Sequence, residues 1–108
     1  MIKNQEAWDR YVESNKNDPY GKACVDVARE VMIVLDEGKE FDCHTLICDA
    51  DEKSSAGGIT GFMAGCVAQM VTRCHSRGEE FQKKWNKDYG VEDSTGVVNP
   101  AILTISEK

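Results

Sequence analysis

The chain has 108 residues, a net charge of −6 at pH 7 and 41% hydrophobic residues. This length suits a single domain, and the apolar content is sufficient for a folded core. The negative net charge argues against direct binding to nucleic acid, because a protein needs a basic surface to bind a phosphate backbone. Residues 1–17 are polar and charged throughout, so we expect no signal peptide and a cytoplasmic location.

The first half of the chain predicts two amphipathic helices. Residues 4–16 carry Trp8, Tyr11 and Val12 among charged residues, which indicates a short helix. Asp18 and Pro19 suit the cap and first turn of a second helix over 19–37. Tyr20 opens a broad apolar face on that helix, so we expect burial on more than one side.

Residues 39–53 show a weaker pattern, and we interpret them as a loop with a short helix near 44–50. Apolar residues then recur every three or four positions over 55–89, which predicts a long third helix. A continuous helix of that length would measure about 50 Å. It would therefore break, most plausibly near Gly78, or it would project and need a partner. The chain is thus expected to be an all-α protein of three principal helices.

Small residues and aromatic residues mark the packing surfaces of this third helix. Gly57, Gly61 and Gly65 stand four residues apart, so their stripe allows another helix to approach closely. Phe81 and Trp85 continue the apolar seam toward the C-terminus. We expect these five residues to lie in helix packing or in a subunit interface.

The C-terminal segment 97–108 is too apolar for a solvated tail, and Pro100 excludes a central strand. We expect residues 1–96 to form one helical domain and 97–108 to form an extended arm. The arm would dock on that domain or on a neighbouring subunit, with Val98, Ile102 and Leu103 in the interface. This arm and the long helix together predict a homo-oligomer.

The uncharged run 54–72 raises the possibility of a membrane span. Its apolar core, Ile59 to Val71, is too short to cross a bilayer, and Gln69 and Thr72 dilute it. We therefore expect no membrane segment.

Cysteine and histidine offer one candidate metal site. Two Cys-His pairs and one further cysteine supply ligand types that zinc accepts, but the spacing matches no common zinc module. Five cysteines without a secretion signal are more typical of reduced thiols. We expect no bound metal, and the candidate ligands, should one bind, are Cys43, His44, Cys48, Cys74 and His75.

No motif assigns catalytic residues or a cofactor. The glycine-rich segment 57–65 has no following lysine and no preceding strand, so it fits neither common phosphate-binding loop. Two alternatives stay open. An anion could bind at the start of this helix, and acids on the second helix could line a metal-dependent nucleotide site. Those acids are Asp26, Glu30, Asp36 and Glu37.

Several phrases of the chain resemble a small family of bacteriophage and prophage proteins. They cover most of the chain in order, and are residues 17–21 (NDPYG), 58–66 (GITGFMAGC), 78–80 with 85–86 (GEE and WN), and 96–103 (GVVNPAIL). The resemblance implies that the protein comes from a phage or prophage and acts in the cytoplasm. It implies no catalytic residues.

These observations favour a protein that binds rather than catalyses. In a phage setting, a small acidic protein is suited to engage a host protein, for instance one used in defence or transcription. The alternative is an oligomeric protein that binds a small ligand such as a nucleotide or a metal, including a metal-dependent hydrolase.

Overall fold

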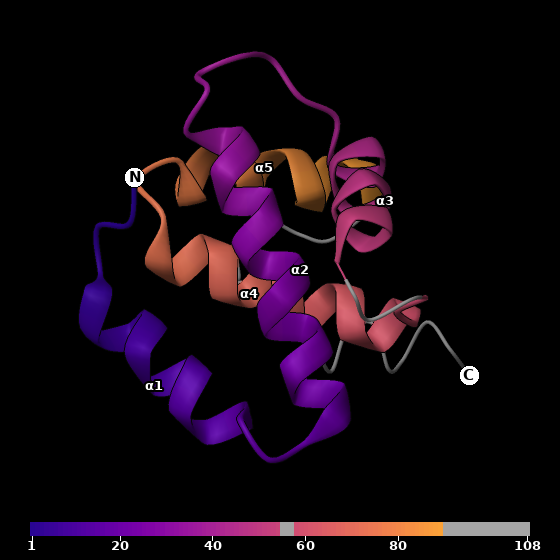
Figure 1. Cartoon of the computed structure of the whole chain (residues 1–108). Coiled ribbons are helices and arrows are strands. Elements are labelled where there is room, and N and C mark those ends of the chain that lie inside the picture. Colours follow the sequence, from indigo (N-terminus) through magenta and orange to yellow (C-terminus); the bar gives the residue numbers. More distant parts are fainter. Residues whose placement is uncertain (55–57, 90–108) are drawn as a thin grey trace.

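The computed structural model describes residues 1–54 and 58–89, and within them all regular structure is helical (Figure 1). The prediction of an all-α protein is confirmed for these residues. These described residues form five helices rather than the predicted three. They are α1 (Gln5–Asn15), α2 (Pro19–Leu35), α3 (Cys43–Lys53), α4 (Gly61–Cys74) and α5 (Gly78–Tyr89).

The first two helices begin and end close to the predicted positions because side chains cap them. The Asn4 side chain accepts a hydrogen bond from Ala7 N at 3.1 Å, at the start of α1. Asp18 accepts one from Tyr20 N at 3.1 Å, and Pro19 follows it in the first turn of α2. These bonds satisfy backbone N–H groups that have no partner within their own helix.

The interpretation of residues 39–53 as a loop with a short helix is wrong in extent. Helix α3 covers eleven residues, and Asp42 caps it by accepting a hydrogen bond from Thr45 N at 3.0 Å. The buried residues of α3 follow helical spacing and are Cys43, Leu46, Ile47 and Ala50. This stripe has only four members and two of them are the small residues Cys43 and Ala50, which explains why the apolar pattern is weak in the sequence.

The predicted helix over 55–89 is two shorter helices. Residues 58–60 precede α4, and Thr60 caps it by accepting a hydrogen bond from Met63 N at 3.2 Å. Helix α4 ends at Cys74, His75 is extended, and α5 begins at Gly78, where the sequence places the break. A continuous helix of about 50 Å would exceed the molecule's longest dimension of 34 Å.

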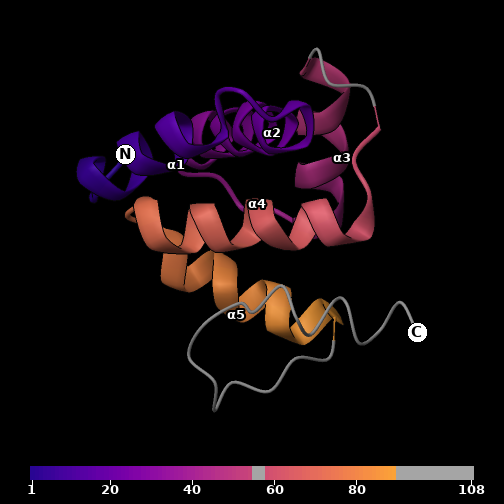
Figure 2. The same ribbon diagram turned by 90° about the horizontal axis from the view of Figure 1, so that it is seen from below.

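Helix α4 is the central element of the fold. Viewed from below, it lies between α5 on one side and the layer of α1 and α2 on the other (Figure 2). Helix α3 stands beside α2 and closes one end of this arrangement. The buried core runs through all five helices, and its fully buried side chains include Val27, Val31, Leu35, Val67, Val71, Phe81 and Trp85.

Several predictions concern residues outside the described part of the chain. They include the arm over 97–108, with Val98, Ile102 and Leu103, and the first glycine of the stripe, Gly57. In the described part, no helix combines the length and the apolar character that a membrane span requires.

Candidate functional site

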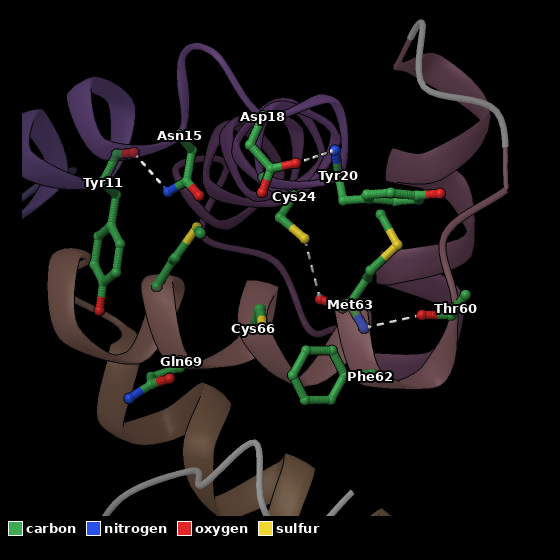
Figure 3. A pocket seen from close by; sticks show the side chains of 12 residues that line it. Tyr11, Asn15, Asp18, Tyr20, Cys24, Thr60, Phe62, Met63, Cys66 and Gln69 are labelled. Carbon is green, nitrogen blue, oxygen red and sulfur yellow. Dashed lines mark hydrogen bonds between the residues drawn. The ribbon is translucent and has the colours of Figure 1, made fainter. Parts of the chain in front are cut away.

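A pocket of about 540 Å³ opens between α4 and the start of α2, with the end of α1 at one side. Figure 3 shows Tyr11 at one end of this pocket, and Tyr20 and Thr60 toward the other. We call it the apolar pocket. Its lining residues are Tyr11, Asn15, Asp18, Tyr20, Gly21, Cys24, Thr60, Phe62, Met63, Cys66, Gln69 and Met70.

Two helix starts give this pocket its shape. Asp18 caps α2 and Thr60 caps α4, so both helices begin beside the opening. The Cys24 thiol donates to the Met63 carbonyl oxygen at 3.7 Å, which joins the two helices in the pocket floor (Figure 3). Each wall includes part of a segment on which the phage resemblance rests, 17–21 on one side and 58–66 on the other.

Large aromatic side chains form the rim of the apolar pocket. Tyr20 is 72% exposed and Phe62 is 43% exposed, although both belong to helices with a buried face. Exposed aromatic side chains beside a pocket are typical of binding surfaces, because they bury a large area when a partner covers them. Within the described part of the chain, this rim is therefore our candidate contact surface.

The chemistry of the lining is apolar with one negative charge. Among the described residues that line it, Asp18 is the single charged one, and none is a lysine, arginine or histidine. Cys24 and Cys66 lie next to each other in the lining. Interaction with the neighbouring Cys66, together with burial, raises the pKa of the Cys24 thiol, and interaction with Cys24 lowers the pKa of Cys66. The pocket is thus suited to an apolar group and unsuited to a phosphate.

A second, polar pocket of about 420 Å³ adjoins the first, and Tyr11 lines both. It lies where α1 faces the C-terminal end of α4. We call it the arginine pocket, because Arg10 and Arg73 line it together with Asn4, Ala7, Tyr11 and Ser14.

The five candidate metal ligands do not lie together in one site. His44 Nε2 and Cys48 Sγ lie 3.7 Å apart on successive turns of α3. Cys43 is buried and its thiol donates to the Phe81 carbonyl oxygen at 3.8 Å, while burial raises its pKa to about 12. Burial also raises the pKa of Cys74 to about 11. In residues 1–54 and 58–89, no three His, Cys, Asp or Glu side chains gather in a metal-binding arrangement.

The surroundings of His75 indicate a structural role. Its ring is fully buried, Nδ1 accepts a hydrogen bond from Arg77 N at 3.0 Å, and Nε2 lies 2.7 Å from Asp36 Oδ1. Burial lowers its pKa to about 4, and the nearby Met1 ammonium and Arg77 act in the same direction. The neutral ring therefore joins the link between α4 and α5 to the end of α2.

Two of the four acids considered for a nucleotide site form contacts within the fold. Asp26 pairs with Arg29 at 3.1 Å, within one turn of α2. Asp36 contacts both His75 and the Met1 ammonium group. Asp26 lies near the middle of α2 and Asp36 at its C-cap, and each has its own partner, so the two carboxylates do not share a site.

The predicted packing residues have different environments. Phe81 and Trp85 are buried in the core of the chain itself, and Phe81 stacks on Phe41 with ring centroids 5.9 Å apart. Gly65 is buried, whereas Gly61 is exposed at the start of α4. Their proposed role in a close helix crossing stays a prediction.

Sequence reasoning missed Tyr20 and Phe62 as surface residues. Tyr20 falls on the apolar face of α2 by periodicity, and that face predicts burial. Both residues lie in the first turn of their helices, two positions after the capping residue. An aromatic residue within two positions of an N-cap was the signal available in the sequence.

Comparison with known proteins gives one family. A family model described as Type I Thoeris inhibitor Tad4 matches residues 1–107. No curated protein and no solved structure matches the chain. The match covers nearly the whole chain and agrees with the phage setting that the resemblance implies. The chain therefore belongs to the Tad4 family of type I Thoeris inhibitors.

Proposed function

We propose that this protein inhibits type I Thoeris by binding a protein component of that host defence system. Membership of the Tad4 family supports the target system. The apolar pocket and its aromatic rim support the mode of action, because they offer a partner a surface that is hydrophobic, concave and framed by tyrosine and phenylalanine.

The observation that carries the proposal is the exposure of Tyr20 and Phe62 beside a pocket without cationic residues. A nucleotide would bring phosphate charges to a lining whose one charged group is Asp18, in a protein of net charge −6. An apolar side chain of a protein meets no such penalty. The same contrast favours a protein partner over the alternative of a nucleotide ligand.

The proposal predicts which variants lose binding. Each protein of a type I Thoeris system is purified and titrated with the wild type, with Tyr20→Ser and with Phe62→Ser. We expect one component to bind the wild type, and each rim variant to weaken that binding by roughly tenfold or more, as aromatic contacts at the centre of an interface do.

Ile33→Ser is the matched control, because Ile33 is an apolar residue of α2 that is 51% exposed and lies outside the lining of the apolar pocket. This control should bind like the wild type. Melting temperatures of all variants separate lost contacts from lost folding. If the rim variants bind as tightly as Ile33→Ser, the apolar pocket is not the binding surface.

A further inference from the structure

The arginine pocket contains two guanidinium groups, those of Arg10 and Arg73, that can bind a partner. Arg73 Nη1 donates to the Tyr11 hydroxyl oxygen at 3.4 Å, and among the described residues no carboxylate forms an ion pair with it. Arg10 pairs with Glu6 at 3.2 Å, but these side chains are 73% and 83% exposed. Such an exposed ion pair contributes little to stability. Arg10 can therefore exchange Glu6 for a better partner.

The other two arginines are committed to the fold. Arg77 forms an ion pair with Glu80 and donates to the Leu35 and Lys39 carbonyl oxygens. Arg29 pairs with Asp26, and its guanidinium lies 5.7 Å from the centroid of the Trp8 ring. The two available guanidinium groups therefore belong to one pocket, and that pocket shares Tyr11 with the apolar pocket.

We propose that the arginine pocket binds an acidic side chain of the same protein segment whose apolar side chain fills the apolar pocket. This inference rests on the proposed function. The partner surface would carry an aspartate or glutamate next to an exposed aliphatic or aromatic residue. Guanidinium groups recognise carboxylates with paired hydrogen bonds, so Arg73 and Arg10 would fix the direction in which the segment lies.

The arrangement of charge sets this orientation. The two cations lie beyond Tyr11 at one end of the combined surface, whereas Asp18 lies within the apolar pocket. An acidic group at the Asp18 end would be repelled, and the same group at the arginine end would be attracted. A peptide segment that crosses Tyr11 would place its acidic side chain in the arginine pocket and its apolar side chain in the apolar pocket.

The test compares charge reversal in the arginine pocket with charge reversal elsewhere. Arg73→Glu and Arg10→Glu are titrated against the Thoeris protein that binds the wild type, at several salt concentrations. We expect roughly tenfold weaker binding and a smaller dependence of affinity on salt. Arg73→Gln, which removes the charge without reversing it, should show an intermediate loss.

Lys83→Glu and Lys87→Glu are the matched controls. Both lysines are exposed on α5, and Lys87 lies in the last turn of its helix, as Arg73 does in α4. These controls change the net charge by the same amount, so they should reproduce any general electrostatic effect. They should leave the affinity within about twofold of the wild type.

The outcomes separate this inference from the proposed function. If Tyr20→Ser weakens binding while the arginine variants match the lysine controls, the inference is overturned and the proposed function stands. If no Thoeris protein binds the wild type, both are overturned. Adenosine diphosphate serves as a probe for the competing ligand class. If it raises the melting temperature of the wild type but not of Arg73→Glu, a nucleotide occupies the site and the peptide inference is overturned.

Discussion

At the residue scale, His75 shows how a buried polar side chain fixes a helix junction. Its Nδ1 accepts a hydrogen bond from the backbone of Arg77, and its Nε2 faces Asp36 at the end of α2. An accepting Nδ1 requires a neutral ring with the proton on Nε2, which then donates to Asp36. Protonation would break the bond to Arg77 and add a positive charge beside the Met1 ammonium group.

This arrangement predicts that the protein loses stability in mild acid. The pKa of His75 is about 4 in the folded chain against an ordinary 6.5, so folding favours the neutral ring. The contribution of His75 is complete above pH 6.5 and is lost as the pH falls toward 4. The expected loss is about 2 kcal/mol at about pH 5. Urea unfolding followed across this range measures it.

His75→Asn supplies the control, because an asparagine can offer an acceptor to Arg77 and does not titrate. The variant should be less stable than the wild type near neutral pH, and its stability should change less between pH 6.5 and 5. If the stability of the two proteins falls equally between pH 6.5 and 5, His75 does not cause the loss of stability in acid.

At the scale of elements, Gly78 explains why one periodic segment forms two helices. A Cβ atom at this position would overlap the Thr72 carbonyl oxygen, so the backbone of α5 approaches α4 more closely than any other residue permits. The Gly78 N–H also donates to the His75 carbonyl oxygen at 2.9 Å. The chain therefore reverses within three residues and packs α5 along α4.

We expect Gly78→Ala to destabilise the fold by about 1–3 kcal/mol or more through overpacking, although alanine favours helix. Gly21→Ala is the comparison. The three nearest atoms to a Cβ at Gly21 all belong to the Asn15 side chain, down to Asn15 Cβ at 2.8 Å, so Gly21→Ala also costs stability but without a backbone overlap. Thermal unfolding of both variants measures the difference. A Gly78→Ala variant that melts at the wild-type temperature would contradict the close approach at Gly78.

These elements also show what the sequence could and could not predict. Helices α1 and α2 were predictable because strong caps, Asn4 and Asp18, precede clear apolar periodicity. The break at Gly78 was predictable from helix length, but the separate start of α4 at Gly61 was not, since helical periodicity continues upstream through Ile59. The apolar pocket depends on how α1, α2 and α4 meet. Such tertiary geometry leaves no spacing signal in the sequence.

At the scale of the whole molecule, the reasons for expecting self-association have changed. Phe81 and Trp85 are buried within one chain, and α4 and α5 cover each other, so none of the helices in residues 1–54 and 58–89 projects and requires a second subunit. The apolar arm remains as the argument for an oligomer, and it lies outside the described residues. We therefore keep docking of the arm on the helical domain or on a neighbouring subunit as a proposal.

Deletion of residues 97–108 tests this proposal. The arm carries five aliphatic side chains, each of which stabilises by about 1.5–3 kcal/mol when fully buried. We expect the truncated protein to melt at a lower temperature and to self-associate less, as measured by calorimetry and light scattering. If neither quantity changes, the arm has no structural role. The aliphatic residues are Val97, Val98, Ile102, Leu103 and Ile105.

We propose above that Thoeris is inhibited through the apolar pocket and its rim. The most direct measurement is the plating efficiency of a Thoeris-sensitive phage on bacteria that carry a type I Thoeris system. The cells express the wild type, the double variant Tyr20→Ser with Phe62→Ser, or Ile33→Ser, at matched protein levels. We expect the wild type and Ile33→Ser to restore plating, and the double variant to leave defence intact. Full restoration of plating by the double variant would contradict the claim.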